Sequence, residues 1–168
     1  MRDGNREIYL TDSFGAAATR LTTQPADDFR PAMSPDRQHI AFVSLRDGNA
    51  EIYVLNVADT NEITRLTAQP STEDEPAWSP DGSELAFVSD RDGNEEIYVM
   101  RKDGTELTRL TDHPAIDASP TWFPDSQTLA ITSNRDEGFE LYLHKRTGGA
   151  LDRITVSSGD NPEPSAGR

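Results

Sequence analysis

Apolar residues in this chain fall in short runs, and each run is bounded by residues that favour turns. The run Leu85-Ala86-Phe87-Val88-Ser89 follows Pro80-Asp81-Gly82, in which the proline presets φ and the glycine accepts a left-handed conformation. Asp92-Gly93, a typical hairpin turn, separates this run from Glu96-Ile97-Tyr98. The pattern predicts a meander of short antiparallel strands, with no helix.

The same signals return at a fixed period. The arginine of an Arg-Asp motif stands at Arg2, Arg46, Arg91 and Arg135, so that the spacing is 44 or 45 residues. Three further motifs, which centre on Trp-Ser-Pro-Asp, Ala-Phe-Val-Ser and Thr-Arg-Leu-Thr, keep the same register. Four apolar runs in a unit of this length are typical of one four-stranded propeller blade.

Counted in this register, the sequence predicts an all-β protein, a β-propeller with four-stranded antiparallel blades, of which about three and a half are present. The expected units are a half blade at 1–24 and full blades at 25–68, 69–112 and 113–156. Residues 157–168 are interpreted as a tail or as the start of a further blade. Because propellers close with four to eight blades, we expect the chain to belong to a longer propeller or to complete one by association.

Composition narrows the partners that we expect. The 168 residues include 30 acidic and 16 basic side chains, and the formal charge of −14 argues against nucleic acid or an anionic membrane as a partner. No apolar run approaches the roughly 18 residues that span a bilayer, so no membrane insertion is expected. The absence of cysteine excludes disulfides and thiolate metal sites.

Four motifs together carry a family resemblance. Pro76–Gly82, Leu85–Ser89, Asp90–Asn94 and Glu96–Tyr98 are similar to the WD-like repeat of the TolB propeller family. The resemblance implies a six-bladed propeller in the complete protein, a periplasmic or extracellular location, and contacts with protein partners. The repeats also resemble the propeller that gates the hydrolase domain of prolyl oligopeptidase-like peptidases.

The acid-rich stretch from Asp90 to Glu96 is similar to the opening of a calcium loop, in which alternate carboxylates and a glycine surround the ion. However, the twelfth position holds no glutamate, Leu45 replaces the first carboxylate in another copy, and Arg91 brings a competing charge. We interpret the stretch as a turn with an internal Arg-Asp pair. No metal and no other cofactor is expected.

Catalysis is not expected either. The sequence has no cysteine and no Gly-x-Ser-x-Gly motif, and His39, His113 and His144 occupy different positions of the repeat. Repeated aromatic positions, such as Trp78 and Trp122, are interpreted as packing between stacked blades.

The crossovers between blades are the variable part of the repeat. Within them, Asp28, Glu73, Asp117 and Asn161 each stand three residues before a proline. Two interpretations are open: the carboxylates ring a channel mouth and attract a cationic group, or each caps its own turn. Because variable loops on a constant frame commonly carry binding contacts, we predict partner contacts at Asp27, Asp28, Phe29, Arg30, Thr72, Glu73, Asp74, Glu75, His113, Ile116 and Asp117.

These observations favour a non-catalytic propeller that acts as a protein-binding scaffold, with the bacterial envelope as the location that the resemblance implies. The alternative is the substrate-gating propeller of a serine peptidase. A third interpretation is a repeat array without a dedicated partner.

Overall fold

The computed structural model describes residues 4–12, 14–15, 17–136 and 138–156. The two interpretations of residues 157–168, and the position of Asn161, therefore fall outside the described residues. Within these ranges the secondary structure consists of strands and turns: β1 (Tyr9–Thr11), β2 (Ala18–Arg20), β3 (Asp28–Met33), β4 (His39–Ser44), β5 (Glu51–Asn56), β6 (Ile63–Arg65), β7 (Glu73–Trp78), β8 (Glu84–Ser89), β9 (Glu96–Arg101), β10 (Thr108–Arg109), β11 (Asp117–Trp122), β12 (Thr128–Ser133), β13 (Glu140–Lys145) and β14 (Asp152–Arg153).

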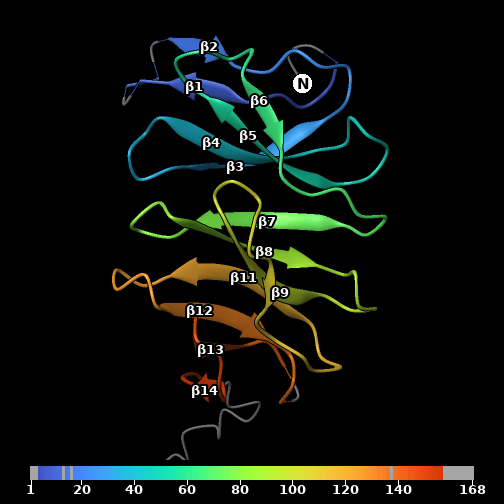
Figure 1. Ribbon diagram of the computed structural model, residues 1–168, viewed down its shortest axis with the longest axis vertical. Helices are drawn as coiled ribbons and strands as arrows, with labels where there is room; N and C mark the ends of the chain where they lie inside the picture. The colour runs from blue at the N-terminus through green and yellow to red at the C-terminus, as the bar shows by residue number, and fades with distance from the viewer. Residues whose placement is uncertain (1–3, 13, 16, 137, 157–168) are drawn as a thin grey trace, which may run out of the picture.

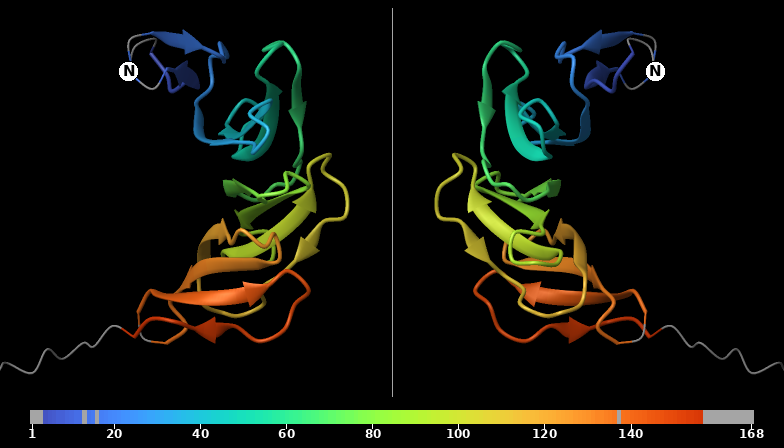
Figure 2. Two further views of the ribbon diagram at one scale, coloured as in Figure 1. Left: turned by 90° about the vertical axis from the view of Figure 1, so that its left-hand side faces the viewer. Right: turned by 90° about the vertical axis from the view of Figure 1, so that its right-hand side faces the viewer.

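The strands form one two-stranded sheet and three four-stranded sheets, and all pairings are antiparallel. β1 pairs with β2, and the larger sheets follow chain order as β3-β4-β5-β6, β7-β8-β9-β10 and β11-β12-β13-β14 (Figure 1). Figure 2 shows the four sheets stacked along an open arc. The predicted fold class, an incomplete propeller of four-stranded blades, is confirmed.

Turn chemistry sets the limits of the strands. Gly93 has a φ of 107° and donates its N–H to Asp90 O at 2.9 Å, which closes the hairpin between β8 and β9. In the preceding turn Gly82 has a φ of 70°, and Arg37 and Ser126 adopt values of 61° and 54° at the equivalent positions. These two residues keep the shape of the glycine turn at a cost of about 1 kcal/mol each.

Successive side chains of each strand point into two different cores, because the side-chain period of a strand is two. In β8, Leu85 and Phe87 pack against the preceding sheet, whereas Ala86 and Val88 pack against the following one. The indole N–H of Trp78 donates to Ala32 O at 3.0 Å across the sheets. Trp122 makes the equivalent bond to Ala77 O at 3.1 Å, in agreement with the packing role expected for the tryptophans.

The first strands of the three complete blades, β3, β7 and β11, contact one another in sequence along the arc. β6 and β10, the last strands of their blades, lie on its outer side (Figure 2). Since each crossover leads from an outer strand to the next inner one, the three described crossovers open at the same ends of the blades. We call the surface formed by residues 22–30, 67–75 and 111–119 the crossover face.

Candidate functional site on the crossover face

Each crossover is held by an asparagine and a glutamate from the preceding blade. Asn94 Nδ2 donates to His113 O and Ala115 O, both at 2.8 Å, and to Glu96 Oε1 at 3.0 Å. Glu96 Oε1 also accepts the backbone N–H of His113 at 2.9 Å. This Asn-Glu clamp recurs with Asn49 and Glu51 at Gln69 and Ser71, and with Asn5 and Glu7 at Gln24 and Ala26.

The clamp was not predicted from the sequence, because Asn94 and Glu96 were interpreted as parts of a hairpin turn and the strand after it. The signal that reveals it is the joint repetition of Asn-x-Glu and Thr-Arg-Leu-Thr. Arg109 Nη2 and Thr111 Oγ1 of the second motif bind the same Glu96 carboxylate, at 3.0 and 2.5 Å. In the last copy Gly138 stands at the asparagine position, so that the clamp side chain is missing there.

The repeated crossover carboxylates are buried. The side chains of Asp28, Glu73 and Asp117 have no exposed surface, and each accepts a hydrogen bond from an arginine 18 residues later. These pairs are Asp28 with Arg46 at 3.1 Å, Glu73 with Arg91 at 2.7 Å, and Asp117 with Arg135 at 2.8 Å.

This burial corrects three expectations. Arg91 binds Glu73, so the internal Arg-Asp pair expected for the turn at 90–96 does not form. The carboxylates are buried and so do not ring an open channel. Within the described part of the chain, the hydrogen bonds that they accept come from side chains, above all from the distant arginines, and not from backbone N–H groups of their own turns. Asp28, Glu73 and Asp117 therefore belong to the interior in this structure, and the surface that a partner can reach consists of the other predicted residues.

Arg91 contacts residues of the first three strands of its blade. Its guanidinium lies 4.6 Å from the ring centre of Tyr98 and 5.7 Å from that of Phe87, in addition to its bond with Glu73. Burial raises the pKa of Glu73, although hydrogen bonds from Ser71, Arg91 and Ser89 favour the charged form.

A second row of residues, which includes the predicted Arg30 and Glu75, lies at the surface of the inner strands. Arg30, Glu75 and Ser119 occupy equivalent positions with φ values of 50°, 54° and 54°, where each strand has an irregular register before a proline. Arg30 binds Asp74 at 3.0 Å and Glu75 at 2.5 Å. Glu75 Oε2 also accepts the N–H of Ser119 at 2.6 Å, so the row links three blades. The structure thus brings Arg30, Asp74 and Glu75 together, as parts of one network.

Two hollows flank this row. The smaller has a volume of about 130 Å³ and carries four carboxylates against one guanidinium. Burial raises the pKa of Asp74, one of these carboxylates. The larger, of about 260 Å³, follows the row and the prolines after it. The residues around the smaller hollow include Arg30, Thr72, Asp74, Glu75, Asp90 and Glu95.

The remaining predicted residues lie in the first and third crossovers. The carboxylate of Asp27 binds Arg6 Nε at 2.9 Å, and the same guanidinium lies 4.1 Å from the ring centre of Phe29. Hydrogen bonds from Arg6 hold the pKa of Asp27 below its usual value. His113 and Ile116 are exposed, and the ring Nδ1 of His113 accepts the N–H of Ala115 at 3.1 Å.

Within the described ranges, no group of three or more His, Asp or Glu side chains is placed to hold a metal ion. The same residues include no helix that is long and apolar enough to cross a membrane.

Known proteins resemble the chain in sequence and in fold. Residues 59–167 match the family model of the TolB beta propeller domain. A "Protein TolB homolog" of Chlorobaculum tepidum is 37% identical over 57 residues, which cover 34% of this chain and 13% of that protein. The crystal structure of TolB from Acinetobacter baumannii has a TM-score of 0.80 at 26% identity, covering 89% of this chain and 37% of that one.

A puromycin-hydrolysing peptidase of Mycobacterium tuberculosis shares the fold, with a TM-score of 0.72 at 17% identity over 92% of this chain and 28% of that one. The chain thus spans less than half the length of each of these proteins.

Proposed function

We propose that this chain, which belongs to the TolB beta propeller domain family, is part of a non-catalytic scaffold that binds a protein partner through its crossover face. The supporting observation is the Asn-Glu clamp. It holds the backbone of the crossovers, for example at His113 and Ala115, while side chains such as Thr72 and Ile116 stay exposed. A surface that is ordered before binding loses less conformational entropy when a partner docks. The family resemblance favours a location in the bacterial envelope.

The charge around the smaller hollow, at the edge of the crossover face, favours a basic partner segment. Asp74, Glu75, Asp90 and Glu95 surround the smaller hollow, and Arg30 is the cation among the residues that line it. The whole chain carries a formal charge of −14, which attracts cationic groups over longer distances. We therefore propose that the partner inserts a lysine or arginine side chain at this hollow.

The alternative is the substrate-gating propeller of a serine peptidase. Its support is a likeness of fold at 17% identity. A reading frame in which this chain continues into a Gly-x-Ser-x-Gly segment would favour the peptidase, and a frame without one would favour the scaffold.

A capture experiment with matched variants tests the scaffold. The immobilised chain is exposed to periplasmic proteins from a bacterium that encodes it, and bound proteins are identified by mass spectrometry. Asp74→Asn with Glu75→Gln removes two charges from the crossover face, and Asp59→Asn with Glu106→Gln removes two from the loops between third and fourth strands. We expect a protein that the wild type and the second variant retain and the first variant loses. Equal capture by both variants would refute the proposed surface.

A further inference from the structure

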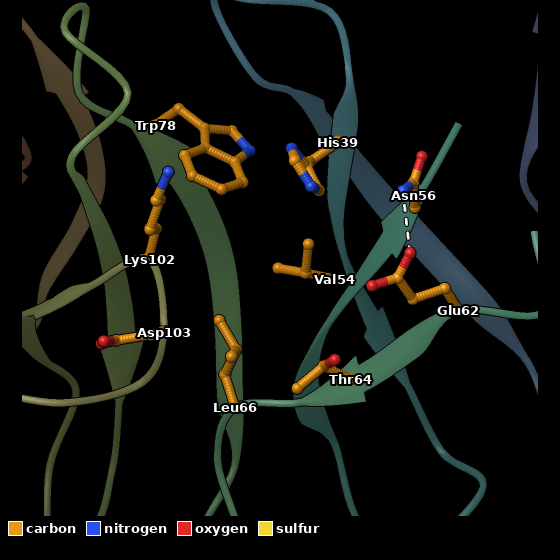
Figure 3. Close-up of a pocket in the computed structure, with 9 residues that line it drawn as sticks. All are labelled: His39, Val54, Asn56, Glu62, Thr64, Leu66, Trp78, Lys102 and Asp103. Atoms are coloured by element: carbon orange, nitrogen blue, oxygen red, sulfur yellow. Dashed lines mark hydrogen bonds between the residues drawn. The ribbon is translucent and has the colours of Figure 1, made fainter. Parts of the chain in front are cut away.

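A pocket lies between the sheets β3–β6 and β7–β10 (Figure 3). His39 begins β4 and Asn56 ends β5, so the pocket is at the ends of the blades opposite to the crossover face. Its volume of about 280 Å³ is close to the lower end of the range of roughly 300–1,000 Å³ for small-molecule sites. Val54 and Leu66 supply apolar surface, and Figure 3 shows the indole of Trp78 near His39, with the ammonium of Lys102 beside the indole.

The interface between the sheets β7–β10 and β11–β14 has different side chains at the positions that correspond to His39 and Lys102. Glu84 and Arg146 stand one repeat after His39 and Lys102. The guanidinium of Arg146 donates to both oxygens of Glu84, at 2.7 and 2.8 Å, and so joins β8 to the turn after β13. The backbone frame is the same at both interfaces, with bonds from Lys102 N–H to Ser83 O at 3.0 Å and from Arg146 N–H to Gln127 O at 2.7 Å.

At the pocket, His39 replaces the carboxylate of this ion pair. Among the residues that the structure describes, neither Lys102 Nζ nor the ring of His39 makes a hydrogen bond or ion pair within the chain. A cation and a ring N–H therefore lie at the position where the neighbouring interface holds a closed Arg-Glu pair.

The carboxylates near the pocket are bound to other groups. Glu62 accepts the side-chain amide of Asn56 at 2.8 Å (Figure 3), and Asp103 accepts the hydroxyl of Thr105 at 2.6 Å. Asp36, which interacts electrostatically with His39 and Lys102, accepts hydrogen bonds from Ser34 Oγ at 2.5 Å and Gln38 N–H at 2.9 Å.

We propose that this pocket binds a small organic carboxylate with an apolar body. The carboxylate occupies the place that Glu84 holds at the next interface and accepts hydrogen bonds from Lys102 Nζ and the His39 ring. The apolar body packs against Trp78, Val54 and Leu66. This site is separate from the proposed protein-binding surface, so either proposal can fail without the other.

Phenylacetate is a suitable probe, and the two tryptophans report on the two interfaces. We expect millimolar phenylacetate to shift the indole N–H resonance of Trp78 in ¹H–¹⁵N spectra of the full chain and to leave that of Trp122 in place. Phenylacetamide, which lacks the charge, should bind at least about tenfold more weakly. The C-terminus of a peptide presents the same carboxylate group, and N-acetylphenylalanine is the probe for it. Tighter binding of N-acetylphenylalanine than of phenylacetate would indicate a peptide C-terminus, and the reverse would indicate a free acid.

Two reciprocal substitutions test the geometry. His39→Glu gives Lys102 the partner that Arg146 has, so we expect a folded chain whose phenylacetate affinity falls at least about tenfold. Glu84→His opens the second interface, and the Trp122 resonance should then respond to phenylacetate. An unmoved Trp78 resonance, equal affinity for phenylacetamide, or unchanged binding by His39→Glu would overturn the proposal.

Discussion

Glu73 and Glu75 stand two residues apart on β7, and each binds an arginine, yet their environments differ. The Glu73 side chain is 0% exposed and its partner Arg91 15%, whereas Glu75 is 24% exposed and its partner Arg30 48%. The three described copies of the crossover keep an acid at the position of Glu73, but they place arginine, glutamate and serine at the position of Glu75. Positions where the copies agree thus hold the frame, and positions where they differ face outward.

The largest expected effect comes from removing the buried cation. Arg91→Ala leaves the Glu73 carboxylate buried without its ion pair, and the free energy of unfolding should fall by about 3–5 kcal/mol. Arg30→Ala is the matched control at the surface, where water replaces the arginine and the loss should stay below about 1 kcal/mol. Denaturant titration measures both. Equal losses of stability would contradict the expectation that the buried ion pair contributes more than the exposed one.

Loss of a clamp should have an intermediate effect. Asn94→Ala removes the bonds to His113 O, Ala115 O and Glu96, and we expect a destabilisation of about 1–3 kcal/mol. Hydrogen exchange should become faster at residues 113–117. Asn61→Ala removes an exposed asparagine that bonds only locally to Asp59, and should change the stability by less than about 0.5 kcal/mol. Unchanged exchange in Asn94→Ala would show that the crossover needs no clamp.

The pH dependence of stability should differ between the buried Glu73 and Asp81, which lies in a turn. Because its pKa is raised above the usual 4.5, Glu73 binds a proton more tightly in the folded state, so its contribution to stability grows as pH falls through the raised pKa toward 4.5. Compared with Glu73→Gln, the wild type should therefore gain stability over this window. Denaturant titrations at several pH values measure the difference, and parallel curves would contradict it.

Asp81 should contribute to stability with the opposite pH dependence. Hydrogen bonds from Ser79 and Ser83 lower its pKa below the usual 3.8, so its stabilising effect is present above 3.8 and is lost as pH falls through the lowered value. Asp81→Asn should remove this loss at low pH.

A small effect on stability is expected at the row that contains Asp74 and Glu75. Asp74→Asn with Glu75→Gln, the variant proposed for partner capture, should change the free energy of unfolding by less than about 1 kcal/mol, because both side chains are partly solvated. Denaturant titration checks this. A larger loss of stability would mean that these side chains are needed for the fold. Loss of partner capture by the variant would then reflect unfolding.

Much of the fold could be predicted because its signals are local. Asp92-Gly93 and Pro80-Asp81-Gly82 connect strands that are neighbours in the chain, so turn chemistry and apolar runs were enough to predict the blades. The candidate site was predicted in part. Thr72 and His113, which variation between the copies predicts as partner contacts, are exposed. The burial of Asp28, Glu73 and Asp117 was not predicted, because their arginine partners lie 18 residues away.

The repeat period and the turn residues determined the four-stranded units, since each hairpin pairs residues that are close along the chain. Which carboxylates face the interior was decided by the tertiary structure. Strand alternation would place Glu73 and Glu75 on the same side, but the strand register shifts after Asp74 and Glu75 has a φ of 54°, which breaks the alternation. His39 and Lys102 likewise meet only because two sheets stack, and the pocket between them exists for the same reason.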